Sequence, residues 1–525
     1  MNYSTGKLAF IFIAALLLSW FGAWLLARRY RLAVQALMRA PSGAPSLEQV
    51  VGPLAPRATT LPAAAVPARS VSLAENRRAG ARLTLGLIGL SALMAVSSAW
   101  LMLALDADAH LLSAKRVAVV ALVHAWPAIP AIGLLWRWSV WRVLGTLLGW
   151  CVLCFAVMLW RSIEPQPLAL LMYLVLDIGA PLVLVALLCL GQTSRAAAPW
   201  LLPPLFGLVW ASIAGIDLLE WLVDQRSPWL FIFPSWFISH GVMAVFALLP
   251  WLVAWWPLRW LGRALGRAYA RRQLADGLVL FTAVWAVALL VQALSTASRA
   301  GLAGTALLLP LGWVPLAVAL WRRLPRAAGR PPTLLVLRVF QHIHSKERQV
   351  QALFDDVVER WRLAGNTVLI AGTDLVDRTL DAADIFTFLD GALAQRFIHE
   401  PADVAPRLKG FDLTPDADGR FRVNECYCHD STWQHALAAL LVSSDVVLMD
   451  LRGFQAHNAG CRFELGTLAQ ASRLARVVVL VDAQTDRACA EADAAGAPAG
   501  RFVWLDAARI DRVTRNALLQ ALFAP

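Results

Sequence analysis

The feature that most constrains this chain is a series of apolar segments, each about 20 residues long, confined to its first 321 residues. A helix needs roughly 20 apolar residues to cross the hydrocarbon core of a bilayer. With 59% hydrophobic and 16% charged residues over 525 positions, the chain has the composition of a membrane protein. We predict a polytopic α-helical region within residues 1–330, with nine transmembrane helices at residues 8–27, 83–105, 116–135, 141–160, 168–191, 200–223, 229–255, 277–296 and 302–321.

Arginine is concentrated in four segments that flank the predicted helices, at residues 28–31, 137–142, 259–272 and 322–330. Lys and Arg accumulate in the cytoplasmic loops of membrane proteins. With nine spans, all four segments fall on one side of the membrane, so the N-terminus is expected outside and the C-terminal part in the cytoplasm. We expect a multi-pass protein of the plasma (inner) membrane. The net charge of +12 then reflects topology and attraction to the anionic inner leaflet, and we expect no nucleic-acid partner.

The third of these segments carries Arg259, Arg263, Arg267 and Arg271, each four residues after the last. On a helix this spacing forms one basic stripe. The stripe is consistent with a helix that lies on the anionic inner leaflet, and equally with a topology signal alone.

Ionisable groups inside predicted spans often mark a ligand or ion pathway. Asp177 is the most central of them, while Asp217 and Glu220 lie near the end of their span, and His240 is a fourth polar position. A transporter is therefore an alternative, although the sequence shows no inverted repeat and no paired broken helices.

Residues 333–525 have the pattern of a separate α/β domain, in which short apolar runs alternate with amphipathic stretches. Strands are predicted at residues 334–340, 367–371, 445–450 and 477–481, with a further edge strand at 501–505. Helices are predicted at residues 347–364, 384–397, 432–442 and 458–474. Alternating strands and helices favour a doubly wound, mostly parallel sheet.

Ligands of such sheets bind beyond the carboxyl ends of the strands. The segments that leave those ends are residues 341–346, 372–374 and 450–460, together with Asp482. The sequence contains no GxGxxG, GxxxxGK[ST] or GxSxG motif, which argues against a standard dinucleotide site, a P-loop and a serine hydrolase.

The most informative stretch is DVVLMDLRGFQAHNAGCRFELGTLA, at residues 445–469. A buried strand ends in Asp450, a loop with Arg452 and Asn458 follows, and a helix then carries Glu464 in its opening turns. A carboxylate near the strand ends can stabilise an oxocarbenium-like transition state or act as a nucleophile in N-glycosidic bond cleavage. The alternative for Glu464 is a carboxylate that complements the helix dipole, and for Asn458 it is a plain N-cap.

Gly460, just before CRFELG, allows a close approach of the backbone. The motif CRFELG at residues 461–466 resembles the strand–loop–helix segment of TIR domains, and it is also similar to the glutamate-bearing helix of nucleoside 2-deoxyribosyltransferases. The run RVFQHIHSKER at residues 338–348 is similar to the start of a TIR domain. Both families have a flavodoxin-like sheet and break N-glycosidic bonds.

This resemblance implies that Glu464 is the catalytic carboxylate and that NAD or a related nucleotide is a substrate rather than a cofactor. Ligand-binding roles are then expected for eight residues, namely Phe340, Ser345, Lys346, Asp374, Asp450, Arg452, Asn458 and Gly460. A role in signalling or defence would follow by analogy. The alternative is a non-catalytic membrane sensor or scaffold that signals through self-association of the TIR-like domain.

A metal site is a weaker hypothesis. Cys426, Cys428 and His429, with His435 further on, stand close together in the chain. The CxCH spacing is not a usual zinc pattern and a second Cys pair is missing, so we expect no metal.

Overall fold

The computed structural model describes residues 5–38, 67–105, 112–162, 166–175, 183–185, 195–226, 232, 234, 236–324, 328–338, 352–371, 380, 382–429 and 432–524. Packing divides the chain into two units. The membrane unit comprises Met1–Arg28, Thr84–Trp321 and Asp381–Asp390. The α/β unit comprises Arg29–Leu83, Arg322–Leu380 and Gly391–Pro525.

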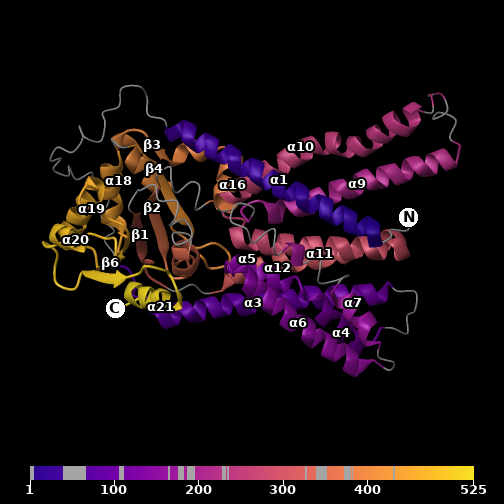
Figure 1. The fold of residues 1–525 in the computed structure, drawn as a ribbon, viewed down its shortest axis with the longest axis horizontal. Helices are drawn as coiled ribbons and strands as arrows, with labels where there is room; N and C mark the ends of the chain where they lie inside the picture. Colours follow the sequence, from indigo (N-terminus) through magenta and orange to yellow (C-terminus); the bar gives the residue numbers. More distant parts are fainter. Residues whose placement is uncertain are drawn as a thin grey trace. The chain divides into compact units, whose positions relative to one another are not determined.

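Long apolar helices dominate the first 323 residues (Figure 1). They are α1 (Thr5–Met38), α3 (Leu73–Ala104), α4 (Ala114–His124), α5 (Ala128–Leu135), α6 (Val140–Arg161), α7 (Pro167–Met172), α9 (Ala198–Asp224), the π-helical turn η4 (Phe237–Val242), α10 (Met243–Ala270), α11 (Asp276–Ala300), the 3₁₀ helix η5 (Gly301–Gly312) and α12 (Trp313–Arg323). Among the described residues, seven helices are long and apolar enough to cross a membrane, or eight if the bent pair α4–α5 is one span. These match eight of the nine predicted spans, and most of residues 168–191 lies outside the described residues.

Side-chain exposure supports a bilayer environment for this unit. Trp141, Trp160 and Leu252 are 83%, 81% and 72% exposed, which would place large apolar groups in water if the unit were soluble. Helix α11 is the exception, because 67% of its most apolar 18-residue stretch is buried, against 6% in α10. Helix α11 is therefore the central helix of the unit.

The predicted basic stripe belongs to α10 itself. Arg259, Arg263 and Arg267 continue the same helix that contains the preceding apolar span, and α10 ends at Ala270. The stripe is thus helical, as its spacing predicts. It is the continuation of α10 and not a separate helix.

Seven parallel strands form the sheet of the α/β unit, in the order β3-β4-β2-β1-β5-β6-β7. Their bounds are β1 (Thr333–Arg338), β2 (Asn366–Ala371), β3 (Phe397–Ile398), β4 (Val423–Cys428), β5 (Val446–Asp450), β6 (Arg476–Val481) and β7 (Phe502–Asp506). The five predicted strands correspond to β1, β2, β5, β6 and β7, and β7 is the predicted edge strand. The parallel sheet and the α/β class are therefore confirmed.

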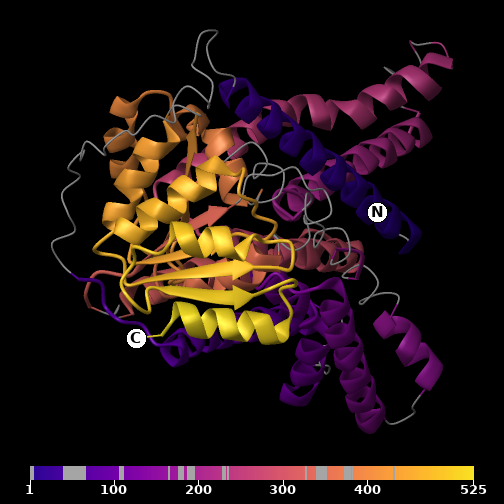
Figure 2. The same cartoon turned by 60° about the vertical axis from the view of Figure 1, so that its left-hand side comes forward.

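Helices cover both faces of this sheet (Figures 1 and 2). They are the π-helical turn η7 (Phe354–Val358), α14 (Glu359–Trp361), α17 (Val404–Lys409), α18 (Trp433–Ser443), α19 (Ala459–Gln470), α20 (Arg487–Asp493) and α21 (Arg512–Leu522). Alternate strand residues such as Leu335, Val447 and Val479 pack with α18, α19 and α20. On the other face Trp361 of α14 packs against Phe523, which follows α21, with ring centroids 5.0 Å apart.

Two strands were missed by the sequence prediction. Strand β4 reads VNECYC, and its Asn and Glu are uncommon in strands, so the pattern gave only a weak strand signal. Strand β3 has two residues and exists because it pairs with β4. Both lie beyond β2 on one side of the sheet.

The helix predicted at residues 384–397 ends early. Helix α16 (Ala382–Asp390) stops before Gly391, which has a φ of +80°, and the 3₁₀ turn η8 (Leu393–Arg396) follows. A glycine with positive φ is a common helix terminator because other residues are strained there.

Helix α16 also packs within the membrane unit, although it lies in the chain between β2 and β3. The Phe386 ring lies 5.7 Å from that of Trp200 and 5.5 Å from that of Tyr269. At Gly266 of α10, a Cβ atom would come within 2.8 Å of the Phe386 carbonyl oxygen. The absence of a side chain at Gly266 is what lets α10 and α16 approach so closely.

Candidate functional site

The carboxyl end of β5 holds a buried ion pair. The Asp450 carboxylate accepts hydrogen bonds from Arg452 Nε at 2.8 Å and Nη2 at 2.7 Å. Both residues are buried, at 6% exposure each. This two-point geometry satisfies the charge of Asp450 locally. The two predicted site residues therefore come together, and they bind each other.

The loop after β5 is tied to the end of β6. The Gly453 amide donates to Asp482 Oδ1 at 2.9 Å, and Gly453 has a φ of +81°. The Thr485 hydroxyl donates to the Leu451 carbonyl at 3.0 Å. These bonds hold the start of α19 in a defined place relative to the strand ends.

Asn458 occupies the N-cap position of α19, as predicted, but its side chain does not cap the helix. Its Oδ1 instead accepts from the Gln455 amide at 2.7 Å, within the preceding loop. A Cβ atom at Gly460 would lie 3.9 Å from the Trp433 ring, which is an ordinary contact distance. Asn458 thus shapes the loop that leads into the helix.

Glu464 is a second buried carboxyl group of this region. It lies on one face of α19 with Cys461, Leu465 and Leu468, all of them buried, and this face packs on the sheet. Glu464 is 3% exposed, and its Oε2 atom has no hydrogen-bond partner among the described residues. Burial raises the pKa of the Glu464 carboxyl to about 8, so the group is mostly protonated at pH 7.

The same desolvation raises the pKa of the Cys461 thiol, and the neighbouring Glu464 charge raises it further. Cys461 is therefore a buried neutral thiol and not a reactive one. A carboxyl that lacks a partner in these surroundings is costly to bury, and costs of this kind concentrate at functional sites.

The remaining predicted site residues, Phe340, Ser345, Lys346 and Asp374, lie outside the described residues. The order of the sheet shows where the chain reverses direction across it. Strand β1 lies between β2 and β5. Strands β2, β3 and β4 lie on one side of β1, and the later strands β5, β6 and β7 lie on the other. In open α/β sheets ligands bind at such a reversal, beyond the carboxyl ends of the strands.

A second group of buried charges was missed by the sequence prediction. Glu359 accepts hydrogen bonds from Arg362 Nη1 at 3.1 Å and from Arg420 Nη1 at 2.5 Å, and all three side chains are buried. Arg420 also donates to Asp418 Oδ2 at 2.8 Å. These residues are up to 61 positions apart in the chain, so no local sequence motif predicts the cluster.

The cysteines and histidines of the predicted CxCH run are spread over β4 and the turn that follows it. Cys426 is fully buried in the core, where its Sγ donates to the Leu369 carbonyl. His429 Nε2 lies 3.1 Å from His399 Nδ1, at the ends of neighbouring strands. In the part of the chain that the structure describes, no three His, Cys, Asp or Glu side chains are grouped as metal ligands.

The polar residues predicted within the membrane spans have ordinary surroundings where they are described. Asp217 forms an ion pair with Lys7 at 2.7 Å. Glu220 is exposed on the unit's surface, and so is His240, whose Nδ1 lies 3.1 Å from the Trp236 carbonyl oxygen. Asp177 lies outside the described residues.

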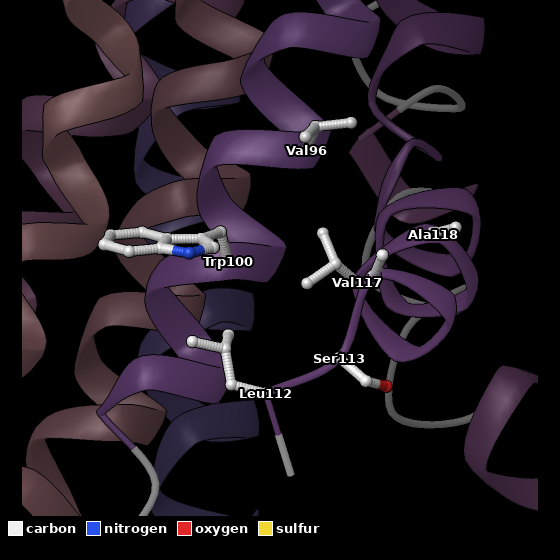
Figure 3. A pocket seen from close by; sticks show the side chains of 7 residues that line it. Val96, Trp100, Leu112, Ser113, Val117 and Ala118 are labelled. Carbon is white, nitrogen blue, oxygen red and sulfur yellow. The ribbon is translucent and has the colours of Figure 1, made fainter. Parts of the chain in front are cut away.

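The described residues of the membrane unit line several hollows, two of which differ in their chemistry. The first is a groove of about 470 Å³ between α3 and α4, in which Val96 of α3 lies across from Val117 of α4 (Figure 3). Of its lining residues, Trp100 and Ser113 alone have polar side-chain atoms, and the Ser113 hydroxyl already accepts from the Arg116 amide. This groove offers an apolar surface and no obvious chemistry.

The second hollow is a cavity of about 180 Å³ beside α11. Its lining is mixed, because α11 contributes Gln292, Ser295, Thr296 and Arg299 along one face. Trp126 lines it from the break between α4 and α5. Sequence reasoning missed these residues, since neutral polar side chains in apolar helices carry little signal.

Comparison of the chain with models of known protein families, with curated proteins and with solved structures gave no match in any of the three.

Proposed function

We propose that the α/β unit is a TIR-like module that binds NAD or a related nucleotide and hydrolyses its N-glycosidic bond, with Glu464 as the catalytic carboxylate. The observation that carries this proposal is that Glu464 is buried on the helix that follows β5, with one oxygen that has no partner in the described part of the chain. The strand order β2-β1-β5-β6-β7 supports a flavodoxin-like core, because that fold has the order 2-1-3-4-5.

In this reaction the bond between the ribose C1′ and the nicotinamide nitrogen breaks, and its electron pair leaves with nicotinamide. A water oxygen bonds to C1′ and releases a proton, so the products are ADP-ribose, nicotinamide and one proton. The transition state has oxocarbenium character, which a nearby carboxylate stabilises. The nicotinamide ribosyl group of NAD is itself cationic, so its binding favours the ionised form of Glu464.

The experiment measures nicotinamide release from NAD by the full-length protein in detergent and in nanodiscs. The full chain is required because Asp381–Asp390 packs within the membrane unit. Glu464→Gln should lower the rate by roughly 10²-fold or more, since a positioned acid or base contributes at least that much. The matched control is Glu491→Gln, because Glu491 is exposed and pairs only with the neighbouring Arg487 among the described residues.

Wild-type protein that folds but releases no nicotinamide would refute the catalytic proposal, and so would a fully active Glu464→Gln variant. The pH profile adds a second readout. Because the pKa of Glu464 is raised to about 8, kcat/KM of the wild type should rise between about pH 6 and pH 8 and level off above.

The basic segments support a further part of the proposal, namely that the module faces the cytoplasm of the plasma membrane. The C-terminal part of α10 contains Arg259, Arg263 and Arg267, and the last turn of α12 contains Arg322 and Arg323. Positive charge at the ends of spans favours the cytoplasmic side. Accessibility of single cysteines introduced beside these arginines to a membrane-impermeant thiol reagent tests the orientation.

A second candidate function is a sensor or scaffold, in which the membrane unit controls self-association of the α/β unit. The packing of α16 favours it, because α16 stands between β2 and β3 in the chain and packs on α10. Any side chain at Gly266 pushes α16 away, whereas a Cβ at Gly262 lies 3.8 Å from Leu389 and is tolerated.

Light scattering of the full-length protein tests this candidate. We expect Gly266→Ala to change the oligomeric state or its dependence on concentration, and Gly262→Ala to leave both unchanged. Identical behaviour of Gly266→Ala and the wild type would exclude α16 as the connecting element.

A further inference from the structure

The cavity beside α11 is built differently from the apolar groove in the same unit. Its residues come from α1, α3, α4 and α11, and α11 is the most buried of the candidate spans. Gln292, Thr296 and Arg299 recur every three or four positions, so they share one face of α11. These side chains therefore form a polar wall of the cavity, which is also lined by apolar residues such as Phe12 and Met102.

Two polar atoms of this lining have no hydrogen-bond partner in the part of the chain that the structure describes. Trp126 is 2% exposed, and its indole Nε1 has no hydrogen-bond partner among the described residues. The same holds for Gln292 Oε1, which is also buried. Buried polar groups are nearly always paired, because leaving one unpaired costs about 1–3 kcal/mol. Both side chains line the cavity, so an occupant of the cavity is placed to satisfy them.

The backbone geometry at the cavity also supports a binding site. Helices α4 and α5 together have the length of one span, but they are bent by 43° at a break of a few residues. Trp126 and Pro127 lie at that break and line the cavity. Non-helical backbone at membrane depth is tolerated where it is buried in protein or lines a polar cavity.

The side chains define the chemistry of an occupant. The Trp126 indole can only donate and the Gln292 oxygen can only accept, so the occupant must offer both an acceptor and a donor. Arg299 is exposed at the end of α11 and supplies a positive charge to the same wall. Phe12, Trp126 and Tyr173 supply aromatic surface for an apolar body.

We propose that this cavity is a binding site for a compact amphipathic hydroxy acid, held by Trp126 and Gln292 and by the charge of Arg299. A volume of about 180 Å³ admits a single small ring or a short chain, and not a whole lipid. The site is independent of the chemistry proposed for Glu464, because its ligand is bound and not cleaved.

The experiment is equilibrium dialysis of radiolabelled 4-hydroxybenzoate against the full-length protein in nanodiscs, with empty nanodiscs as background. Benzoate lacks the hydroxyl donor, and 4-hydroxybenzyl alcohol lacks the negative charge. The wild type should bind 4-hydroxybenzoate saturably, and each analogue at least about tenfold more weakly, as expected when a buried polar group loses its partner.

Gln292→Leu and Arg299→Gln should each abolish the preference for 4-hydroxybenzoate over one of the two analogues. Gln292→Leu should weaken 4-hydroxybenzoate binding about tenfold and abolish the preference over benzoate. It should also unfold at the same or a higher temperature, since it removes an unsatisfied polar atom, so weaker binding cannot be ascribed to misfolding. Arg299→Gln, at an exposed position, should abolish the preference over the alcohol.

Trp126→Phe should weaken binding by a similar factor, and Trp100→Phe is its matched control, because Trp100 lines the apolar groove instead. If the wild type did not bind 4-hydroxybenzoate saturably, the proposal would be overturned, and water would be the expected occupant of the cavity. Equal binding by the wild type, Gln292→Leu and Trp126→Phe would overturn it as well, because the ligand would then lie elsewhere.

Discussion

Glu359 and Glu464 are equally buried glutamates of the α/β unit, each 3% exposed, but their surroundings are opposite. Glu359 accepts hydrogen bonds from two arginines, Arg362 and Arg420. Among the described residues, Glu464 has apolar neighbours on α19 and no partner for its Oε2 atom. The difference teaches that depth of burial does not by itself distinguish a structural carboxylate from a candidate catalytic one. The partners do, because they decide whether the charge is already stabilised.

The largest effect should follow from Glu359→Gln. The substitution leaves the buried Arg362 and Arg420 without their shared carboxylate, and breaking a buried ion pair from one side costs roughly 3–5 kcal/mol. We expect the unfolding temperature of the full-length protein to fall by several degrees, measured by fluorescence-detected thermal unfolding. An unchanged unfolding temperature would mean that the arginines find other partners, and the comparison with Glu464 would fail.

Glu464→Gln should have the opposite sign. The folded-state pKa of about 8 lies above the ordinary value of 4.5, so Glu464 favours folding least above pH 8, where the carboxylate is ionised. Glu464→Gln removes the ionisable group, so it should stabilise the protein at pH 8, by up to about 4 kcal/mol, and by less near pH 5.

Thermal unfolding of wild type and Glu464→Gln at both pH values measures this difference. A loss of stability in Glu464→Gln at pH 8 would show that the carboxylate has a partner, and Glu464 would then belong with Glu359.

The smallest effect is expected from Glu491→Gln. Glu491 pairs with Arg487 at 2.7 Å on the exposed surface of α20, at 46% side-chain exposure. Exposed pairs of this kind contribute little because water screens them. The unfolding temperature should match that of the wild type at every pH. A clear decrease would indicate that pairing matters more than burial, which would weaken the contrast drawn between the two buried glutamates.

Much of the architecture is predictable because it depends on local patterns. Eight apolar segments were located from hydropathy, and β1, β2, β5, β6 and β7 from short apolar runs between polar stretches. Strands β3 and β4 were not predicted. Val423–Cys428 contains Asn and Glu, which form hydrogen bonds with residues outside the strand and are uncommon in strands. Asn424, for example, accepts a hydrogen bond from the Asp412 amide at 2.7 Å.

The candidate site was predictable only in part, for the same reason. The order Asp450, Arg452, Asn458 and Glu464 along the chain suggests a strand, a loop and a helix, and the structure has them in that order. That order does not predict that Asp450 and Arg452 bind each other, or that Glu464 Oε2 has no partner within the described ranges. The roles of Phe340, Ser345, Lys346 and Asp374 remain predictions.

The sequence by itself determined the elements of this protein: which segments are apolar enough to enter a membrane, and which alternate as strands and helices. These properties follow from hydropathy and periodicity, which act between residues close in the chain. Only the tertiary structure decided which polar groups are satisfied. Glu359 meets Arg420 across 61 positions, and Trp126 at the break between α4 and α5 lines the same cavity as Gln292 of α11. The cost of burying a polar atom depends on its neighbours in space, and those are set by packing.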